Sequence, residues 1–148
     1  MPGACRTPGW LTQTLYAHRG LHGVGVPENS LAAAEGAMAR GLGIECDIQR
    51  SHDGAAMVFH DWELERLTGT QADLKDLRAH QIEGFCLLGT DQRPVRLARF
   101  LEQIGGRVPI LIEVKSMPGY DVTASCEAVA RDIESYTGSH AVMSFDPR

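Results

Sequence analysis

The chain has 148 residues, of which 43% are hydrophobic and 22% are charged, and its formal net charge is -5. This length suits one domain with a sizeable core, and the acidic balance without runs of Lys or Arg argues against a nucleic-acid partner. No apolar stretch is long enough to cross a bilayer, and residues 1–15 contain no continuous apolar core, so we expect neither a membrane span nor a signal peptide. The four cysteines form no C-x-x-C pair, which predicts reduced thiols in a cytoplasmic protein rather than a disulfide framework or a zinc site.

The first half of the chain alternates strand and helix patterns. Residues 1–13 contain several Pro and Gly residues and predict a loose N-terminal leader. A glycine-rich loop then ends at Asn29 and Ser30, either of which can cap the helix that follows. We expect strands at about 14–17, 43–48 and 56–59, and a helix at about 31–40.

The second half is irregular at first and regular afterwards. Residues 61–94 show only short helical pieces, such as 73–79, and we interpret this region as an insertion on the surface of the core. Helices are expected at about 96–104 and 122–136, and strands at about 109–115 and 140–145. The apolar stripe of the last helix, which predicts its buried face, consists of Val122, Cys126, Val129 and Ile133.

Strands that alternate with helices predict right-handed βαβ units and a parallel sheet, so the fold class is α/β. An open doubly wound sheet and a closed barrel both fit this pattern. No G-x-G-x-x-G motif follows the first strand, so the phosphate loop of dinucleotide-binding folds is absent from the sequence.

The stretch 44–48 places two acids in a short apolar strand. Side chains two apart on a strand share a face, so Glu45 and Asp47 lie together while their apolar neighbours face the other way. Buried carboxylates need a compensating charge, and a hard divalent cation supplies it. A half-exposed strand whose acids face water remains the alternative for this motif by itself.

Polar residues recur at the carboxyl ends of the predicted strands. In parallel α/β folds these ends form the functional face. Glu113 and Lys115 share a face by the same two-residue spacing as Glu45 and Asp47, so three acids and a lysine can converge. In chain order, the strand-end residues are His18 and Arg19, Glu45 and Asp47, His60 and Asp61, Glu113 and Lys115, and Ser144 and Asp146.

Several short motifs, taken in order, resemble those of the glycerophosphodiester phosphodiesterases. The resemblance covers roughly residues 14–146, and its specificity lies in the ordered set rather than in any one piece. The matching residues are His18-Arg19-Gly20, Pro27-Glu28-Asn29-Ser30, Glu45-x-Asp47, Asp53-Gly54, Val58-Phe59-His60-Asp61, Leu64-x-Arg66-x-Thr68-Gly69 and Glu113-Val114-Lys115.

The resemblance implies an eight-stranded parallel β/α (TIM-type) barrel, of which this chain would cover about the first five units. It further implies hydrolysis of glycerophosphodiesters to glycerol 3-phosphate and an alcohol, in lipid metabolism, with the substrate's own glycerol hydroxyl as nucleophile. By the same resemblance, Glu45, Asp47 and Glu113 bind a calcium or magnesium ion, His18 and His60 are the general acid and base, and Arg19 and Lys115 bind the phosphate.

Structural roles compete with these assignments at some residues. Arg19 can pair with Glu28 or Asp47 instead of binding phosphate, Lys115 can neutralise Glu113, and Asp61 can orient His60. At 95–99 the sequence Val-Arg-Leu-Ala-Arg replaces the family's usual Thr-Leu-x-Glu pattern, for which we expect a local consequence.

The predicted sheet ends early for a complete barrel, which takes about 250 residues. We therefore expect a fragment of a longer protein, with self-association through the open barrel edge as a further possibility. Two functional alternatives to the hydrolase remain open. One is a non-catalytic half-barrel that acts as an interaction module, and the other is a phospholipase-C-like lyase that releases a cyclic phosphate.

Overall fold

The computed structural model describes residues 6–147. Residues 1–5 of the predicted loose leader therefore lie outside the described residues, as does Cys5. Within the described part of the leader, Gly9–Gln13 form the short helix α1.

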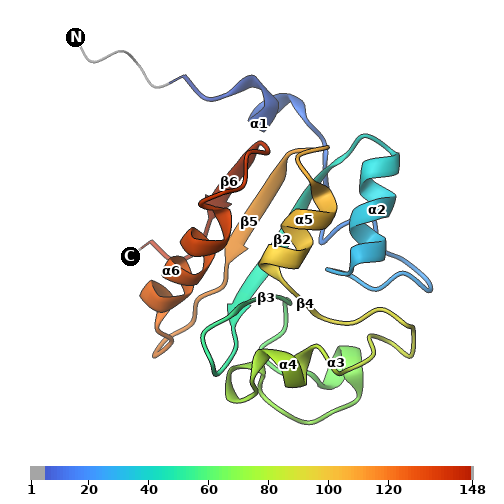
Figure 1. The fold of residues 1–148 in the computed structure, drawn as a ribbon, viewed down its shortest axis with the longest axis vertical. Coiled ribbons are helices and arrows are strands. Elements are labelled where there is room, and N and C mark those ends of the chain that lie inside the picture. The colour runs from blue at the N-terminus through green and yellow to red at the C-terminus, as the bar shows by residue number, and fades with distance from the viewer. Residues whose placement is uncertain (1–5, 148) are drawn as a thin grey trace.

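A six-stranded sheet forms the centre of the described chain (Figure 1). Its longest strand, β2, pairs with β5 along one side; along the other side it pairs with β1 through its first half and with β3 through its second half. Strands β1, β2, β5 and β6 run parallel, as predicted. The strands are β1 (Tyr16–His18), β2 (Gly43–Arg50), β3 (Ala56–Val58), β4 (Val95–Arg96), β5 (Ile110–Val114) and β6 (His140–Met143).

The third predicted strand does not follow the parallel pattern. Strand β3 runs antiparallel to β2, and the unpredicted two-residue strand β4 runs antiparallel to β3. The connection between β2 and β3 is too short for a crossover; it is a tight turn in which Ser51 and Ala55 are hydrogen-bonded. Only antiparallel neighbours can be joined by such a turn, so β2 and β3 form a hairpin and not a β/α unit.

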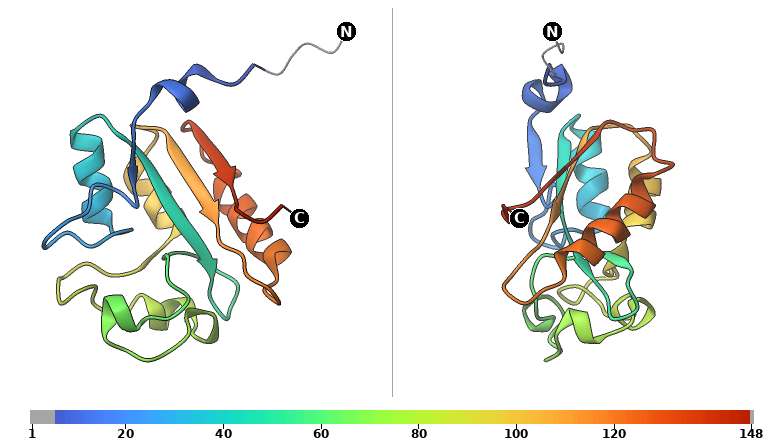
Figure 2. Two further views of the ribbon diagram at one scale, coloured as in Figure 1. Left: turned by 180° about the vertical axis from the view of Figure 1, so that it is seen from behind. Right: turned by 90° about the vertical axis from the view of Figure 1, so that its left-hand side faces the viewer.

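The three longest helices cover one face of the sheet, as the edge-on view in Figure 2 shows. They are α2 (Leu31–Ala39), α5 (Leu97–Ile104) and α6 (Val122–Ile133). Their buried residues pack in one core against Ile44, Cys46 and Ile48 of β2, so the acids that alternate with these residues face away from the helices. The open sheet with helices on one face fits part of a β/α barrel.

Side-chain oxygens cap the starts of α2 and α6. Ser30, rather than Asn29, caps α2 by accepting the Ala33 N–H at 3.1 Å, and Asp121 caps α6. The buried stripe of α6 differs from the prediction, since Cys126 is exposed whereas Ser125, Ala128 and Val129 are buried.

The region 61–94 contains short helices and a second, smaller core. Its helices are α3 (Glu65–Thr68), the 3-10 helix η1 (Leu74–Asp76) and α4 (Ala79–Ile82). Buried Leu64, Leu67 and Leu74 pack there with Met57 and Phe59, which attaches the region to the end of β3 (Figure 1). No helix of the described residues is long and apolar enough to cross a membrane.

The turn after β1 depends on Gly20. Its φ of +77° is in the left-handed region, and a Cβ atom there would lie 2.7 Å from Ala33 Cβ and 2.8 Å from the Ala33 backbone carbon. Gly25 has nearly the same φ of +76°, but a Cβ there would meet nothing within 4 Å. The two glycines thus share a backbone requirement and differ in packing.

Gly20→Ala should therefore lower the free energy of unfolding by about 2–4 kcal/mol, because backbone strain and overpacking add. Gly25→Ala, the matched control, should lower it by only about 1 kcal/mol. Urea denaturation of both variants measures the difference, and equal losses would contradict the close packing of α2 on this turn.

Candidate active site

Three buried carboxylates converge on the sheet face that the helices leave uncovered. Glu45 and Asp47 come from β2, and Glu113 of β5 lies directly beside Asp47 in the parallel register. One oxygen from each carboxylate lies within 4.8 Å of the others, and the three residues are 6%, 0% and 8% exposed. The predicted convergence of Glu45, Asp47 and Glu113 is thus present, and the alternative of a solvated strand face is wrong.

The charges of this cluster are only partly balanced by its surroundings. Glu45 Oε1 and Asp47 Oδ1 are buried and have no hydrogen-bond partner among the described residues. Burial, reinforced by the charges of Asp47 and Glu113, raises the pKa of Glu45 to about 7. A set of oxygen donors with unpaired buried atoms and excess negative charge fits a hard divalent cation.

The opposite oxygens of the carboxylates are held by neighbouring donors. The Arg19 backbone N–H donates to Glu45 Oε2 at 3.1 Å, and Arg19 Nε lies 3.5 Å from Asp47 Oδ2. Asn29 Nδ2 donates to the same Asp47 oxygen at 3.0 Å, and Lys115 Nζ lies 3.6 Å from Glu113 Oε1. These donors orient the three carboxylates, while Glu45 Oε1 and Asp47 Oδ1 have no hydrogen-bond partner among the described residues.

The two predicted histidines follow different strands and have different partners. His18 ends β1 beside Glu45 in the strand register; its Nε2 is 3.8 Å from Glu45 Oε2, and its side chain is 69% exposed. His60 follows β3, and its Nδ1 lies 2.8 Å from Asp61 Oδ1. Asp61 thus orients the ring of His60, which is the structural role considered for Asp61 in the sequence analysis. His18, in contrast, faces solvent.

Arg19 and Asn29 both adopt the left-handed backbone conformation, with φ of 58° and 56°. Asn tolerates this region, but a long side chain such as that of Arg does so at a cost of about 1–2 kcal/mol. The Asn29 N–H donates to the Arg19 carbonyl at 2.9 Å and stabilises the pair. Strain of this kind concentrates at functional sites.

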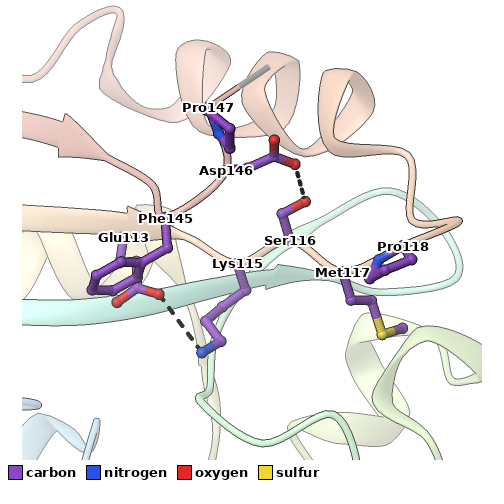
Figure 3. A pocket seen from close by; sticks show the side chains of 8 residues that line it. All are labelled: Glu113, Lys115, Ser116, Met117, Pro118, Phe145, Asp146 and Pro147. Carbon is purple, nitrogen blue, oxygen red and sulfur yellow. Dashed lines mark hydrogen bonds and ion pairs between the residues drawn. The ribbon is translucent and has the colours of Figure 1, made fainter.

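Two hollows open beside Lys115. One, of about 340 Å³, is lined by Glu113, Lys115, Met117 and Phe145 among others (Figure 3). The other, of about 320 Å³, is lined by residues 60–63 and again by Lys115. Lys115, the partner of Glu113, thus lines both hollows.

Some residues at the site were not predicted to act there. Buried Gln49 extends the line of Glu45 and Asp47 on β2, and its Nε2 donates to the carbonyls of Phe59 at 3.0 Å and His60 at 2.9 Å. Gln49 lies two residues after Asp47 on the same strand, so the period-two spacing could have placed it on the acidic face from the sequence alone. Arg66, far along the chain, reaches Asp61 and Glu28, and no periodicity indicated that contact.

The fold has counterparts among solved structures. A glycerophosphodiester phosphodiesterase of Agrobacterium tumefaciens aligns with a TM-score of 0.73 at 28% identity, over 90% of this chain and 58% of that chain. A phosphodiesterase of Oleispira antarctica, solved in complex with the product sn-glycerol-3-phosphate, has a TM-score of 0.82 over the same shares. Its 21% identity supports a common fold only.

The sequence comparisons confirm the family. The model of the "Glycerophosphoryl diester phosphodiesterase family" matches residues 18–145, and the chain belongs to this family. A glycerophosphodiester phosphodiesterase of Caldanaerobacter subterraneus subsp. tengcongensis is 35% identical over 107 residues, which are 71% of this chain and 40% of that protein. One of Bacillus altitudinis is 39% identical over 70 residues, 47% of this chain and 28% of that protein. The chain thus spans less than half the length of these curated relatives.

The raised pKa of Glu45 has a consequence for stability without metal. Its unfolded-state pKa is near 4.5, and folding raises it to about 7, so the protonated form is favoured in the folded chain. The stability that this group contributes is complete below the unfolded pKa and is lost as pH rises through the folded pKa. The loss amounts to at most about 3 kcal/mol.

In the presence of a metal chelator, the free energy of unfolding of the wild type should therefore fall as the pH rises from about 4.5 to about 7. The fall should be steeper in the wild type than in Glu45→Gln. Glu35→Gln, at an exposed acid whose pKa is lowered by hydrogen bonds from Arg107 and Gln103, is the control and should leave this slope in place. Denaturation at several pH values measures it. Parallel curves for wild type and Glu45→Gln would contradict the raised pKa of Glu45, which burial and the neighbouring carboxylates cause.

Proposed function

We propose that this chain carries the active site of a metal-dependent phosphodiesterase that hydrolyses glycerophosphodiesters to glycerol 3-phosphate and an alcohol, in lipid metabolism. The observation that carries the proposal is the buried cluster of Glu45, Asp47 and Glu113, with two unpaired oxygens, between His18 and Lys115. Membership of the family and the similarity to proteins named as glycerophosphodiester phosphodiesterases support it. The open sheet would form part of a β/α barrel.

The three carboxylates would hold calcium or magnesium, since both ions prefer oxygen ligands. The bound ion supplies positive charge that stabilises the negative charge growing on a phosphodiester during its cleavage. Glu45 Oε1 and Asp47 Oδ1 are the donors best suited to it, because no described residue bonds them.

The two histidines would transfer the protons. In the implied reaction, the glycerol hydroxyl attacks phosphorus, the bond to the alcohol breaks, and water then opens the cyclic phosphate. One histidine takes the proton of the attacking hydroxyl and the other donates a proton to the departing alcohol oxygen. His60 is prepared for this because Asp61 holds its Nδ1, which leaves Nε2 for the substrate.

Arg19 and Lys115 would bind the phosphate. Each is the cationic partner of one metal-binding acid, Asp47 or Glu113, at 3.5 Å or 3.6 Å. These distances exceed those of tight charge-assisted hydrogen bonds, so Lys115 can turn toward a phosphate oxygen. Arg19 is also held by Glu28 at 2.9 Å, so it would use its remaining N–H donors for the phosphate. The structural and the functional readings of these residues are thus compatible.

The cysteines support a reducing compartment. Cys46, Cys86 and Cys126 are free thiols, and burial raises the pKa of Cys46, which makes that thiol unreactive. We therefore include a cytoplasmic location in the proposal.

Metal binding can be measured without turnover. Titration calorimetry with calcium or magnesium should give one site in the wild type, and Asp47→Asn should weaken it at least tenfold. Glu102→Gln, on the exposed side of α5, is the control and should bind as the wild type does. Equal affinity in Asp47→Asn would place the ion elsewhere.

Catalysis requires an assay on this chain and on a form extended by about 100 residues, the length that a complete barrel needs. With glycerophosphocholine and metal, His18→Ala and His60→Ala should each lower kcat by about 10²–10⁴ in whichever form turns over. His80→Ala, at an exposed position of α4, should have no effect.

Phosphorus NMR of the product distinguishes the alternatives. Glycerol 3-phosphate supports the hydrolase, whereas a cyclic phosphate as final product would indicate the lyase. Absence of turnover in both forms would favour the non-catalytic interaction module. In that case the exposed edge at Val142, Met143 and Phe145 is the surface to test for self-association.

A further inference from the structure

The guanidinium of Arg66 joins two acids that flank the candidate site. Its Nε and one terminal nitrogen donate to Asp61 at 2.6 Å and 2.9 Å. Its two terminal nitrogens donate to Glu28 at 3.0 Å and 2.8 Å. Arg66 lies on α3, outside the sheet, and belongs to the Leu64-x-Arg66-x-Thr68-Gly69 motif, for which the catalytic scheme has no role.

On one side, this contact reaches the proton-transfer residue. Asp61 accepts from Arg66 through both oxygens, and one of them also lies 2.8 Å from His60 Nδ1. The hydrogen bonds from Arg66 hold both oxygens of Asp61 in place, and they lower the pKa of Asp61 to about 2. An ionised acceptor at Nδ1 selects the His60 tautomer that carries its proton there.

On the other side, the contact reaches the phosphate-binding cation. Glu28 also accepts from the Arg19 terminal nitrogen at 2.9 Å. Burial alone would raise the pKa of Glu28, but hydrogen bonds and charges from Arg66 and Arg19 together lower it. Glu28 thus holds Arg19 at one end of its guanidinium, while Arg19 Nε faces Asp47.

These contacts form a chain in which positive and negative side chains alternate. It runs from Arg19 through Glu28, Arg66 and Asp61 to His60. Glu28, His60 and Asp61 also lie close enough together to suggest a second cation site. That reading is disfavoured because Arg66 already donates to both carboxylates and its positive charge would have to leave first. A guanidinium suits this position because its planar fork serves two carboxylates at once.

The region 61–94 fixes where Arg66 stands. Leu64 and Leu67 are buried in the second core, on either side of Arg66 in the chain. Gly69 ends α3 in the left-handed conformation and donates its N–H to Glu65. Leu64 and Gly69 of the motif, together with Leu67, therefore anchor the helix turn from which Arg66 projects.

We propose that Arg66 is a positioning residue that sets the orientation of His60 through Asp61 and of Arg19 through Glu28. Its functional meaning rests on the proposed phosphodiesterase activity. Loss of Arg66 then affects proton transfer and phosphate binding together, although Arg66 touches neither substrate nor metal.

The first test reads the His60 ring directly by nitrogen-15 NMR of the metal-free chain at a pH where the imidazole is neutral. The wild type should show the Nδ1–H tautomer, and Arg66→Gln should shift His60 toward the Nε2–H tautomer that free imidazole prefers. Arg96→Gln is the matched control, since Arg96 pairs with Glu83 at 2.9 Å, is similarly exposed and lies outside the network.

Arg96→Gln should leave the His60 signals unchanged. An unchanged tautomer in folded Arg66→Gln would overturn the proposal. Should Arg66→Gln fail to fold by circular dichroism, Arg66→Lys decides by the same signal, because a point charge cannot hold both carboxylates in the same fork.

The second test uses whichever form turns over. Arg66→Gln should lower kcat and raise KM, each by about tenfold, whereas Asp61→Asn should act mainly on kcat and Glu28→Gln mainly on KM. A loss in Arg66→Gln confined to thermal stability, with both constants unchanged, would overturn the proposal. If no form turns over, the proposed function fails while the tautomer measurement still decides the role of Arg66.

Discussion

The site depends on one electrostatic constraint: three carboxylates share a buried face of the sheet. One oxygen of each lies within 4.8 Å of the others. Without compensation, such a cluster opposes folding, because its charges are buried and repel one another, and the same causes raise the pKa of Glu45. The register of β2 against β5 makes the cluster unavoidable, because it pairs Asp47 with Glu113 while the apolar residues between the acids form the core under the helices. The fold thus places negative charge where a divalent cation would remove its cost.

The surrounding residues divide the compensation among themselves. Arg19 contacts one oxygen of Glu45 and one of Asp47, Asn29 contacts the same Asp47 oxygen, and Lys115 contacts one oxygen of Glu113. Glu45 Oε1 and Asp47 Oδ1 keep no hydrogen-bond partner among the described residues. A second layer, formed by Glu28, Asp61 and Arg66, balances the charge of Arg19 and connects Arg19 to His60. The left-handed backbone at Arg19 is understandable in this setting, since it directs both the amide and the side chain of one residue toward the acids.

Much of this was accessible from the sequence, because period-two spacing on strands determines which side chains share a face. That rule predicted the convergence of Glu45, Asp47 and Glu113, and the ordered motifs predicted the family.

The same rule did not predict strand direction. Strand β3 was expected to be parallel, although the short turn at 52–54 could have indicated a hairpin. The contacts of Arg66 with Glu28 and Asp61 could not be predicted, because they depend on how region 61–94 packs and no local pattern encodes that. Cys126 was misplaced because α6 buries its small residues Ser125 and Ala128 instead.

The central claim is that Glu45, Asp47 and Glu113 form one metal site. Anomalous diffraction from crystals of this chain grown with manganese, an oxygen-preferring substitute for magnesium or calcium, tests it most directly. One strong anomalous peak within bonding distance of all three carboxylates is the predicted result. A peak at Glu28, His60 and Asp61 instead, or none near the three carboxylates at saturating manganese, would contradict the claim.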